Sequence, residues 1–470
     1  VMTSLVELAQ TGELVRDALH TLGVTLTAAG IMSAVGAAVG LAVGLLPTLR
    51  DYVVASIDFL RTIPAVTLIP VAVLTSGPVA TTELMLAMYA ALWPVVLCTA
   101  GAAAAVHPRQ YDIARMLRFS RTTTVQKIVL PAVVPAWLVG ARLAAVVALL
   151  VALVAEMIMY PRGLGGGLIE SLNALAPARM WAYALVCGVI GFALNAVLRR
   201  AVRLVIPGSP ANAAGDVTVS VEPVITQPAT RVRGLLPLAA ALVTWQLVAT
   251  SDSLFFPPPS EWLKALRRLY DGGVLTPAVA QTVSTYALGL SFAVAIGALV
   301  GAAIGASRRI DRALTPSIDF MAAIPGAAAV PVAVLLLGPN QLSGVVVVAL
   351  IVSWPILLAT AMAMRTVPAV RIEMSRTLGL TLAQRWSKVI VPSLTPGVIL
   401  GMRVASAMAL IVTLLVDIFG VGAGLGRLLI ESQQRFEAAT AWGLLVIVGA
   451  FGYLTSVFFA WAGRTSRHVH

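Results

Sequence analysis

The sequence predicts an all-α, polytopic membrane protein with about 11 transmembrane helices, arranged as two parallel repeats of about five spans with one extra span between them. Two observations lead to this fold class. First, 59% of the 470 residues are hydrophobic, only 11% are charged, and the mean hydropathy is +0.94. Second, the chain repeats itself. A water-soluble globule could not bury so much apolar surface, which excludes soluble enzymes, nucleic-acid-binding domains and disordered tails.

The internal repeat has an offset of 261 residues and runs from about Leu5 to Trp181 without a gap. Residues 57–78 align with 318–339, and 12 of these 22 positions are identical. Glycine, proline and tryptophan positions outside this stretch recur at the same offset. A repeat of this length indicates two homologous membrane-spanning repeats within one chain.

Apolar runs predict five spans in each repeat, because a helix needs about 20 residues to cross the hydrocarbon core. The second run of each repeat is short and contains proline, so we expect a broken or kinked helix there. The glycine-rich run GLGGG at 163–167 is expected to form a tight turn. The predicted spans are 21–46, 62–77, 80–105, 132–160 and 181–205, and then 280–306, 323–338, 340–365, 393–421 and 440–463.

The composition also predicts the domain organisation. The first repeat covers 1–207, and a cytoplasmic linker rich in Pro, Ala, Ser and Thr follows over 208–233. An extra transmembrane helix is expected over 234–252, and the second repeat covers 253–470. Because a repeat with an odd number of spans would return inverted, one added span restores the parallel orientation.

Basic residues predict the orientation. Most of the 32 Lys and Arg residues lie on one side if the loops 106–131 and 366–392 are cytoplasmic, as the positive-inside rule requires. The N-terminus is then outside and the C-terminus cytoplasmic, and Ser171 and Ser432 are expected to be accessible from outside. This pattern also explains the net charge of +12 without an anionic ligand or nucleic acid.

The two basic loops share a motif. Each has an acidic residue, a short helical stretch, a basic residue, an apolar triplet and a proline. This pattern resembles the cytoplasmic EAA loop of binding-protein-dependent ABC importer permeases, in which a short helix fits a groove on an ATPase. The matching residues are Asp112, Ala114 and Pro131 in the first loop and Glu373, Gly379 and Pro392 in the second.

The resemblance narrows within the second repeat. The Pro-rich run 253–266, the Ile-Pro and Trp-Pro pairs and the Gly-Leu-Gly run look like the sulfonate, taurine and nitrate permeases. The likeness covers nearly all of 253–463 and, more loosely, 5–200. Members of that family usually have one such repeat per chain and pair with a second chain. The resemblance therefore implies that this chain is a complete permease by itself.

The resemblance also implies a location and a set of partners. They are the bacterial plasma (inner) membrane, two cytoplasmic ATP-binding subunits and an extracytoplasmic solute-binding protein, with no nucleic acid. The chain is expected not to be an enzyme, because none of its three lysines follows glycine as a P-loop requires. ATP and Mg²⁺ are therefore expected on the partner subunits, and no cofactor in this chain.

The resemblance implies that the loop residues couple the permease to the ATPase. Gly379 is expected to end its helix in a left-handed turn. Arg118 occupies the equivalent position, so the first helix is expected to continue or to end differently, and the two loops to dock unequally. The expected coupling residues are Asp112, Ala114, Arg115, Arg118, Pro131, Glu373, Arg376, Gly379 and Pro392.

Four charges lie inside the fourth predicted spans. Arg142 and Arg403 each precede an acid, Glu156 or Asp417, by 14 residues, which places the two groups about 21 Å apart on one helix. They either line the translocation pathway, with Arg near the cytoplasmic mouth and the acid near the outer one, or clamp neighbouring helix ends. The four histidines are too scattered to suggest a metal site, and no catalytic constellation is present.

Two function hypotheses follow. The first is the transmembrane permease subunit of an ATP-driven ABC importer for a small organic or inorganic solute, such as a sulfonate, taurine or nitrate. The alternative is an ion-coupled secondary transporter with two repeats, a class that often uses inverted repeats. The parallel orientation and the paired loops favour the importer.

Overall fold

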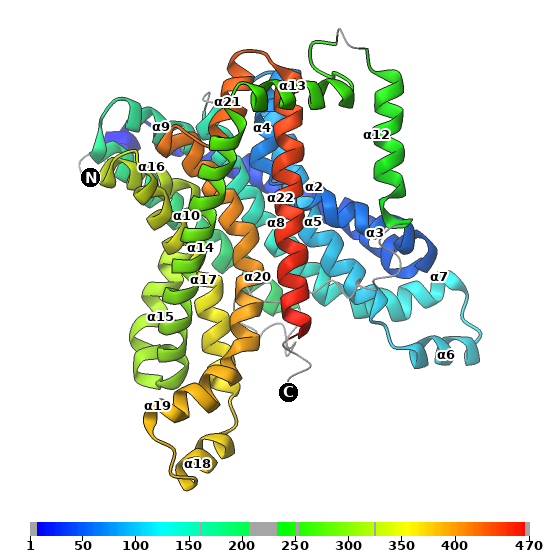
Figure 1. Ribbon diagram of the computed structural model, residues 1–470. Helices are drawn as coiled ribbons and strands as arrows, with labels where there is room; N and C mark the ends of the chain where they lie inside the picture. The colour runs from blue at the N-terminus through cyan, green and yellow to red at the C-terminus, as the bar shows by residue number, and fades with distance from the viewer. Residues whose placement is uncertain (1–6, 160–161, 206–232, 251–252, 324–325, 466–470) are drawn as a thin grey trace. The chain divides into compact units, whose positions relative to one another are not determined.

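The computed structural model describes residues 7–159, 162–205, 233–250, 253–323 and 326–465, and within these ranges the chain is helical with no strand (Figure 1). The first helices are α2 Glu13–Leu45, α3 Pro47–Leu60, α4 Ala65–Ser76, α5 Ala80–Ala104, α6 Pro108–Met116, α7 Arg121–Thr124, the π-helix η1 Val125–Val129, α8 Leu130–Met159, α9 Leu164–Asn173, α10 Pro177–Val205, the 3₁₀ turn η3 Arg233–Leu235, α12 Leu236–Val248 and α13 Pro259–Asp271.

The remaining helices repeat this order. They are α14 Leu275–Ala306, α15 Arg308–Ala323, α16 Gly326–Leu337, α17 Gln341–Thr366, α18 Ala369–Thr377, α19 Leu382–Arg385, the π-helices η4 Trp386–Ile390 and η5 Asp417–Val421 on either side of α20 Val391–Val416, α21 Leu425–Gln434 and α22 Ala438–Thr465. The predicted linker 208–233 lies outside the described residues except for its last position.

The chain divides into two compact units. The first unit comprises Val1–Gly215, Val219–Arg268 and Glu431–Leu445, and the second comprises Asp216–Thr218, Leu269–Ile430 and Val446–His470.

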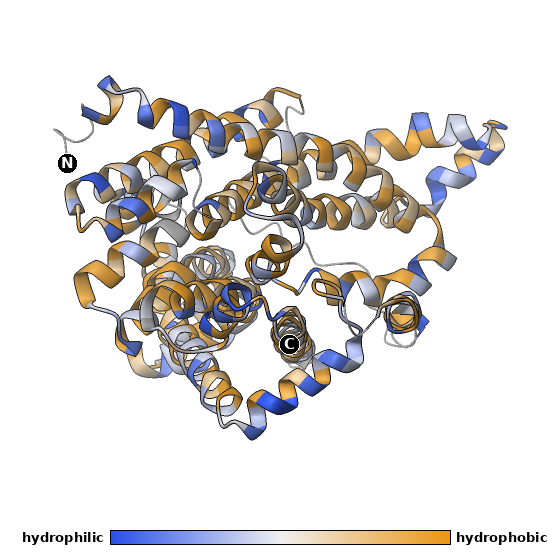
Figure 2. Ribbon diagram, turned by 90° about the horizontal axis from the view of Figure 1, so that it is seen from above, coloured by the Kyte–Doolittle hydropathy of each residue, from blue (hydrophilic) through white to orange (hydrophobic). Residues whose placement is uncertain are grey.

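Eight helices in the described residues are long and apolar enough to cross a membrane, four from each repeat, and the bent pair α3–α4 raises the number to nine. Figure 2 shows hydrophobic residues over most of the length of the long helices. The expected number of about 11 is therefore only approximately supported. The difference comes from the second predicted spans and the extra span, because α4, α16 and α12 have only 12, 12 and 13 residues.

Close helix packing forms the core of each unit. In the first unit α5 packs between α2 and α8, and in the second α17 packs between α14 and α20. Glycine permits the close contact: a Cβ at Gly40 would lie 2.7 Å from the Cβ of Thr99, and one at Gly301 would lie 2.4 Å from the carbonyl oxygen of Leu357. Small residues at such positions let transmembrane helices approach each other closely.

The fourth span of each repeat begins earlier than predicted. It starts at Arg121 rather than near 132, because the Ser120 hydroxyl caps the helix by accepting from the Thr123 N–H at 3.1 Å. The helix then runs through η1 to Met159, and its counterpart runs from Leu382 to Gly420. A π-turn precedes the proline in each case, which accommodates the missing N–H and the ring.

An aromatic cluster joins α12, α13 and the start of α22 within the first unit. The Trp245 ring lies edge-on to Trp262 and Trp442, with centroid distances of 4.9 and 4.7 Å, and the latter two rings stack at 5.4 Å. The Trp442 Nε1–H donates to the Phe255 carbonyl at 3.1 Å. The Pro-rich run therefore positions the amphipathic helix α13 against α12 and the start of α22.

The two serines expected to be accessible from outside are buried. Ser171 is 1% exposed and Ser432 is 2% exposed, because each lies on the inner face of a short helix, α9 or α21. Two residues further along, Asn173 and Gln434 are exposed and are equivalent in the repeat. These positions report the side on which the short helices lie.

Single cysteines can test the parallel repeat. In a cysteine-free background, Asn173→Cys and Gln434→Cys should both react with an impermeant maleimide in intact cells. The equivalent exposed positions Thr122→Cys and Ala383→Cys should react only after permeabilisation. Labelling of Asn173→Cys and Gln434→Cys from opposite sides would show that the repeats are inverted.

Candidate functional site

Two short helices, α6 and α18, occupy the loops that the sequence singled out. α6 starts at Pro108, where the His107 Nδ1 accepts from the Arg109 N–H at 3.1 Å, and it ends at Met116. α18 ends at Thr377. A new N-cap follows each helix within a few residues, so that each loop is a short helix, a tight turn and the start of a long helix.

The turns after the two helices are the same. Arg118 has φ 53° and Gly379 has φ 65°, both left-handed. The Phe119 N–H donates to the Ala114 carbonyl at 2.9 Å, and the corresponding bond in α18 is 3.1 Å long. The expectation that the first helix would end differently is therefore wrong. Backbone hydrogen bonds at the helix end stabilise the left-handed conformation even for arginine, so the expected unequal docking loses its basis.

One face of each short helix is buried. Ala114 and its repeat equivalent Ser375 are 3% and 1% exposed. Tyr111 packs against a core cluster that includes Val129 and Val133 on the following helix. Ala114, predicted as a coupling residue, thus supports α6 from behind rather than facing outward.

The other face of each helix is exposed. Asp112 and Arg115 form a 3.5 Å ion pair with side chains 63% and 83% exposed, and Glu373 and Arg376 are also exposed. Exposed ion pairs of this kind contribute little to the stability of the fold. The charged side chains are therefore accessible for contacts with a partner protein.

Apolar side chains accompany these charges, and the sequence reasoning missed them. Ile113 and Leu117 are 53% and 59% exposed, and the equivalent Met374 and Leu378 are 57% and 71% exposed. The signal was present in the sequence, because apolar residues recur at the same two positions of both loops, four residues apart on one helix face.

The predicted pathway acid of the first unit is fully buried and bonded. The Thr21 hydroxyl donates to Glu156 Oε1 at 2.7 Å, and the Gly165 N–H donates to Oε2 at 2.8 Å. Thr21 Oγ1 in turn accepts from the Leu164 N–H at 3.1 Å. Glu156 therefore joins α2, α8 and the N-terminus of α9.

The second unit repeats this arrangement. The Thr282 hydroxyl donates to Asp417 Oδ2 at 2.6 Å and accepts from the Leu425 N–H at 2.8 Å. The Gly426 N–H points to the same carboxylate oxygen at 3.4 Å. Sequence reasoning missed both threonines, although their offset of 261 marks them as a repeated pair.

The GLG runs begin helices rather than forming the expected tight turn. Gly163 has φ 97° and Gly424 has φ 100°, and a Cβ at either would lie within 2.4 Å of the buried carboxylate. Glycine is required there both for the backbone and for the space. The carboxylate then neutralises the N-terminal N–H groups of α9 or α21.

The predicted coupling residues and the predicted pathway acids lie at opposite ends of the fourth span of each repeat. The coupling helices precede the start of α8 and α20, whereas Glu156 and Asp417 lie near the far ends of those helices. Arg142 and Arg403 lie between them and are half-buried. The pathway role of these four residues stays a prediction.

A charged cleft of about 240 Å³ adjoins α9 in the first unit. Arg179 pairs with Glu13 at 2.7 Å, and the Tyr183 hydroxyl donates to Asp17 at 3.0 Å. The positions equivalent to these four residues in the second repeat are uncharged: Val274, Ala278, Thr440 and Leu444. The cleft is lined by Glu13, Arg16, Asp17, Arg162, Gly163, Gly166, Gly167, Glu170, Arg179 and Tyr183.

Each repeat thus has long apolar helices and one exposed short helix in the same connection, as expected from the resemblance to ABC importer permeases. The chain belongs to the family of binding-protein-dependent transport system inner membrane components, whose sequence profile matches residues 28–209 and 293–468. The family therefore matches both repeats separately, which confirms the predicted recognition and the internal duplication.

Curated relatives match about half of this chain. A putative aliphatic sulfonates transport permease protein (SsuC) of Bacillus subtilis is 25% identical over 229 residues, which are 48% of this chain and 83% of the relative. The bicarbonate transport system permease protein CmpB of Synechococcus elongatus is 28% identical, with 49% and 88% covered. The nitrate import permease protein NrtB of Synechocystis is 24% identical, with 49% and 86% covered.

The left-handed turns yield a first prediction. Arg118→Gly should stabilise the end of α6 by up to about 1 kcal/mol, since only the non-glycine residue resists φ > 0. Gly379→Arg should weaken the end of α18 by a similar amount. Hydrogen exchange of the two loops should slow about fivefold in the first variant and accelerate about fivefold in the second. Faster exchange in Arg118→Gly, or a change in only one of the two loops, would mean that the two turns are not equivalent.

The close approach of the carboxylate to the glycine yields a second prediction. Gly163→Ala and Gly424→Ala should each lower the stability by at least about 2 kcal/mol, because the new methyl group overlaps the carboxylate. Gly30→Ala is the matched control, since a Cβ there meets nothing within 4 Å. Thermal unfolding in detergent, followed by size-exclusion chromatography, measures the effect. A loss no larger than in the control would show that the carboxylate does not contact the glycine.

Proposed function

We propose that this chain is the complete membrane-spanning part of an ATP-driven importer, with two permease units fused in one polypeptide. The observation that supports this proposal is the pair of equivalent short helices, α6 and α18. About half of this chain, which corresponds to one repeat, covers more than 80% of the length of these relatives. The two fused repeats would then take the place of two separate permease subunits.

In this proposal α6 and α18 each dock on a cytoplasmic ATP-binding subunit, which holds ATP and Mg²⁺. The exposed apolar pair fits a groove, and the exposed acid and arginine flank it. Each short helix is followed by a continuous helix of 39 residues, Arg121–Met159 or Leu382–Gly420. Movement of the ATP-binding subunit can therefore be transmitted through the membrane by a rigid element.

The proposed orientation places these loops, and the C-terminus, in the cytoplasm of a bacterium and the N-terminus outside. An extracytoplasmic solute-binding protein then docks at the opposite ends of the helices, where α9 and α21 lie. Glu156 holds α9 in place in the first unit, and Asp417 holds α21 in the second.

The proposed solute is a small oxyanion. The relatives are named for aliphatic sulfonates, bicarbonate and nitrate, which share a delocalised negative charge on oxygen. One arginine in the fourth span of each unit, Arg142 or Arg403, is proposed to meet this charge nearer the cytoplasmic mouth. Mass spectrometry of the ligand retained by the solute-binding protein would identify the solute directly.

Charge reversal on α18 tests the coupling role. Glu373→Arg should reduce solute uptake to background and prevent recovery of the ATP-binding subunit with the permease, while membrane insertion is retained. The matched control is Arg309→Glu on α15, an exposed charge outside the two coupling helices, which should leave uptake unchanged. Normal uptake in Glu373→Arg would remove the coupling role from this residue. Uptake that persists in ATP-depleted cells would favour the ion-coupled alternative.

A further inference from the structure

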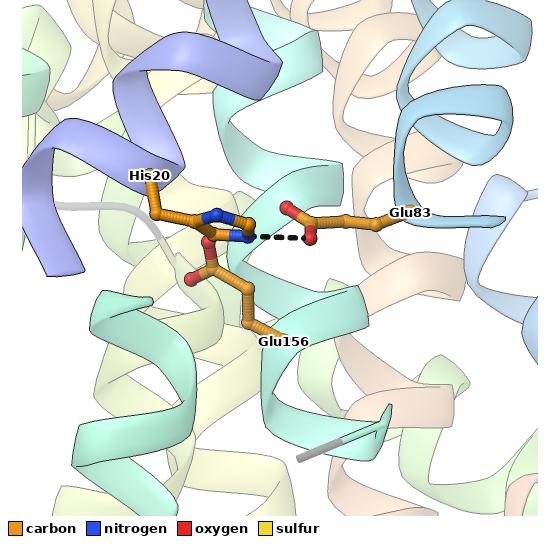
Figure 3. A group of neighbouring side chains, drawn as sticks. All are labelled: His20, Glu83 and Glu156. Carbon is orange, nitrogen blue, oxygen red and sulfur yellow. Dashed lines mark hydrogen bonds and ion pairs between the residues drawn. The ribbon is translucent and has the colours of Figure 1, made fainter. Parts of the chain in front are cut away.

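Three side chains that can each offer a ligand atom to a metal ion lie close together at one end of the first unit. His20 on α2, Glu83 on α5 and Glu156 on α8 point toward one another, as Figure 3 shows. One ligand atom from each lies within 4.8 Å of the other two, and His20 Nε2 lies 3.0 Å from Glu83 Oε2. The separation of His20 and Glu83 by 63 positions hid this group from sequence reasoning.

The group contains an unsatisfied oxygen. Glu83 is 3% exposed, and its Oε1 has no hydrogen-bond partner in the described part of the chain. In Figure 3 the Glu83 carboxylate is directed at the imidazole and at Glu156. A buried carboxylate oxygen without a partner is costly, and two buried carboxylates at this separation repel each other. A cation between them removes both penalties.

The second repeat shows that this cluster is not required by the fold. Gln281, Gly344 and Asp417 occupy the equivalent positions, so only the acid of the fourth span is kept. A Cβ at Gly344 would lie 2.6 Å from Cγ1 of Val416, which shows that apolar packing fills this space. In the described residues the buried acid of the second unit also has an oxygen without a partner, Asp417 Oδ1, but apolar packing takes the place of the second acid there. The histidine and the extra acid are therefore what distinguish the first unit, and they point to a ligand.

We propose that His20, Glu83 and Glu156 bind a divalent transition-metal ion of the Zn²⁺ class. One imidazole nitrogen and two carboxylates are a donor set that such ions take, at about 2.0–2.2 Å. Tetrahedral ligands at that radius lie about 3.4 Å apart, so the side chains need to move by only a small amount to bind the ion.

The surroundings suit such a site. Glu156 already accepts hydrogen bonds from Thr21 and the Gly165 N–H, which orient its carboxylate as outer-shell partners do in metal sites. The His20 side chain is 25% exposed, which gives an entry path. The ion connects α2, α5 and α8 at the end of the first unit that lies away from α6.

Metal binding to the full-length permease in detergent tests this proposal. After treatment with a chelator and equilibration with Zn²⁺, elemental analysis should find one tightly bound ion per chain. His20→Gln, which installs the residue of the second repeat, and Glu83→Gln should each weaken Zn²⁺ binding by at least about tenfold. Asp417→Asn and the double change His468→Ala with His470→Ala are the controls, and both should bind Zn²⁺ as the parent does.

A second variant separates the loss of a metal ligand from misfolding. His20→Cys should bind Zn²⁺ more tightly than His20→Gln does, because a thiolate is also a zinc ligand. With Co²⁺ in place of Zn²⁺, His20→Cys should show a thiolate-to-cobalt charge-transfer band, and adding Glu83→Gln should weaken this band. No bound Zn²⁺ in the parent protein would overturn the proposal and would leave a proton shared between the two carboxyl groups. Equal Zn²⁺ binding in His20→Gln and the parent would also overturn it.

Discussion

Inside a membrane every backbone N–H needs a partner from the protein itself, and this constraint explains the most highly organised part of each unit. The short helices α9 and α21 begin beside the ends of the long helices, where their first N–H groups would otherwise lack acceptors. A buried acid and a threonine supply these acceptors in both units, Glu156 with Thr21 and Asp417 with Thr282. The carboxylate thereby fixes three helices, and the glycine beside it cannot be replaced without a steric overlap.

The two ends of the long fourth helix of each repeat carry different features. At one end of the long fourth helix lies an exposed short helix with apolar and charged side chains, and at the other end lies the carboxylate-capped helix. The continuous helix between them is suited to transmit movement. The two units share this plan but differ around the acid, where the first unit has His20, Glu83 and a charged cleft and the second has apolar packing.

Much of the fold followed from the sequence because lipid demands long apolar runs and the repeat gave each prediction a second copy. Four predicted spans per repeat are long helices, and both loops contain the expected short helix. The break expected at the prolines of the second predicted span is present in the first repeat, where α3 and α4 meet at 84°. The extra span was overestimated, because hydropathy alone cannot show that α12 has only 13 residues. Residue preferences misled at Arg118, where backbone hydrogen bonds outweigh the intrinsic cost of φ > 0.

The site was harder to predict because its partners are remote in the sequence. Glu156 was recognised as an intramembrane acid, but its bond to Thr21 spans 135 positions and depends on how α2 packs against α8. Ser171 and Ser432 were expected to be accessible, yet the face of a short helix that is buried depends on the tertiary packing. Exposed apolar residues on α6 and α18 resemble ordinary core positions until the structure shows that nothing covers them within their units.

The central claim is that one copy of this chain forms the whole membrane part of the transporter. Native mass spectrometry of the complex, purified in detergent from its own membrane through a tag on this chain, measures the composition directly. We expect one copy of this chain with two ATP-binding subunits. A complex with two copies of this chain, or a chain that purifies without any ATP-binding subunit under conditions in which uptake is intact, would contradict it.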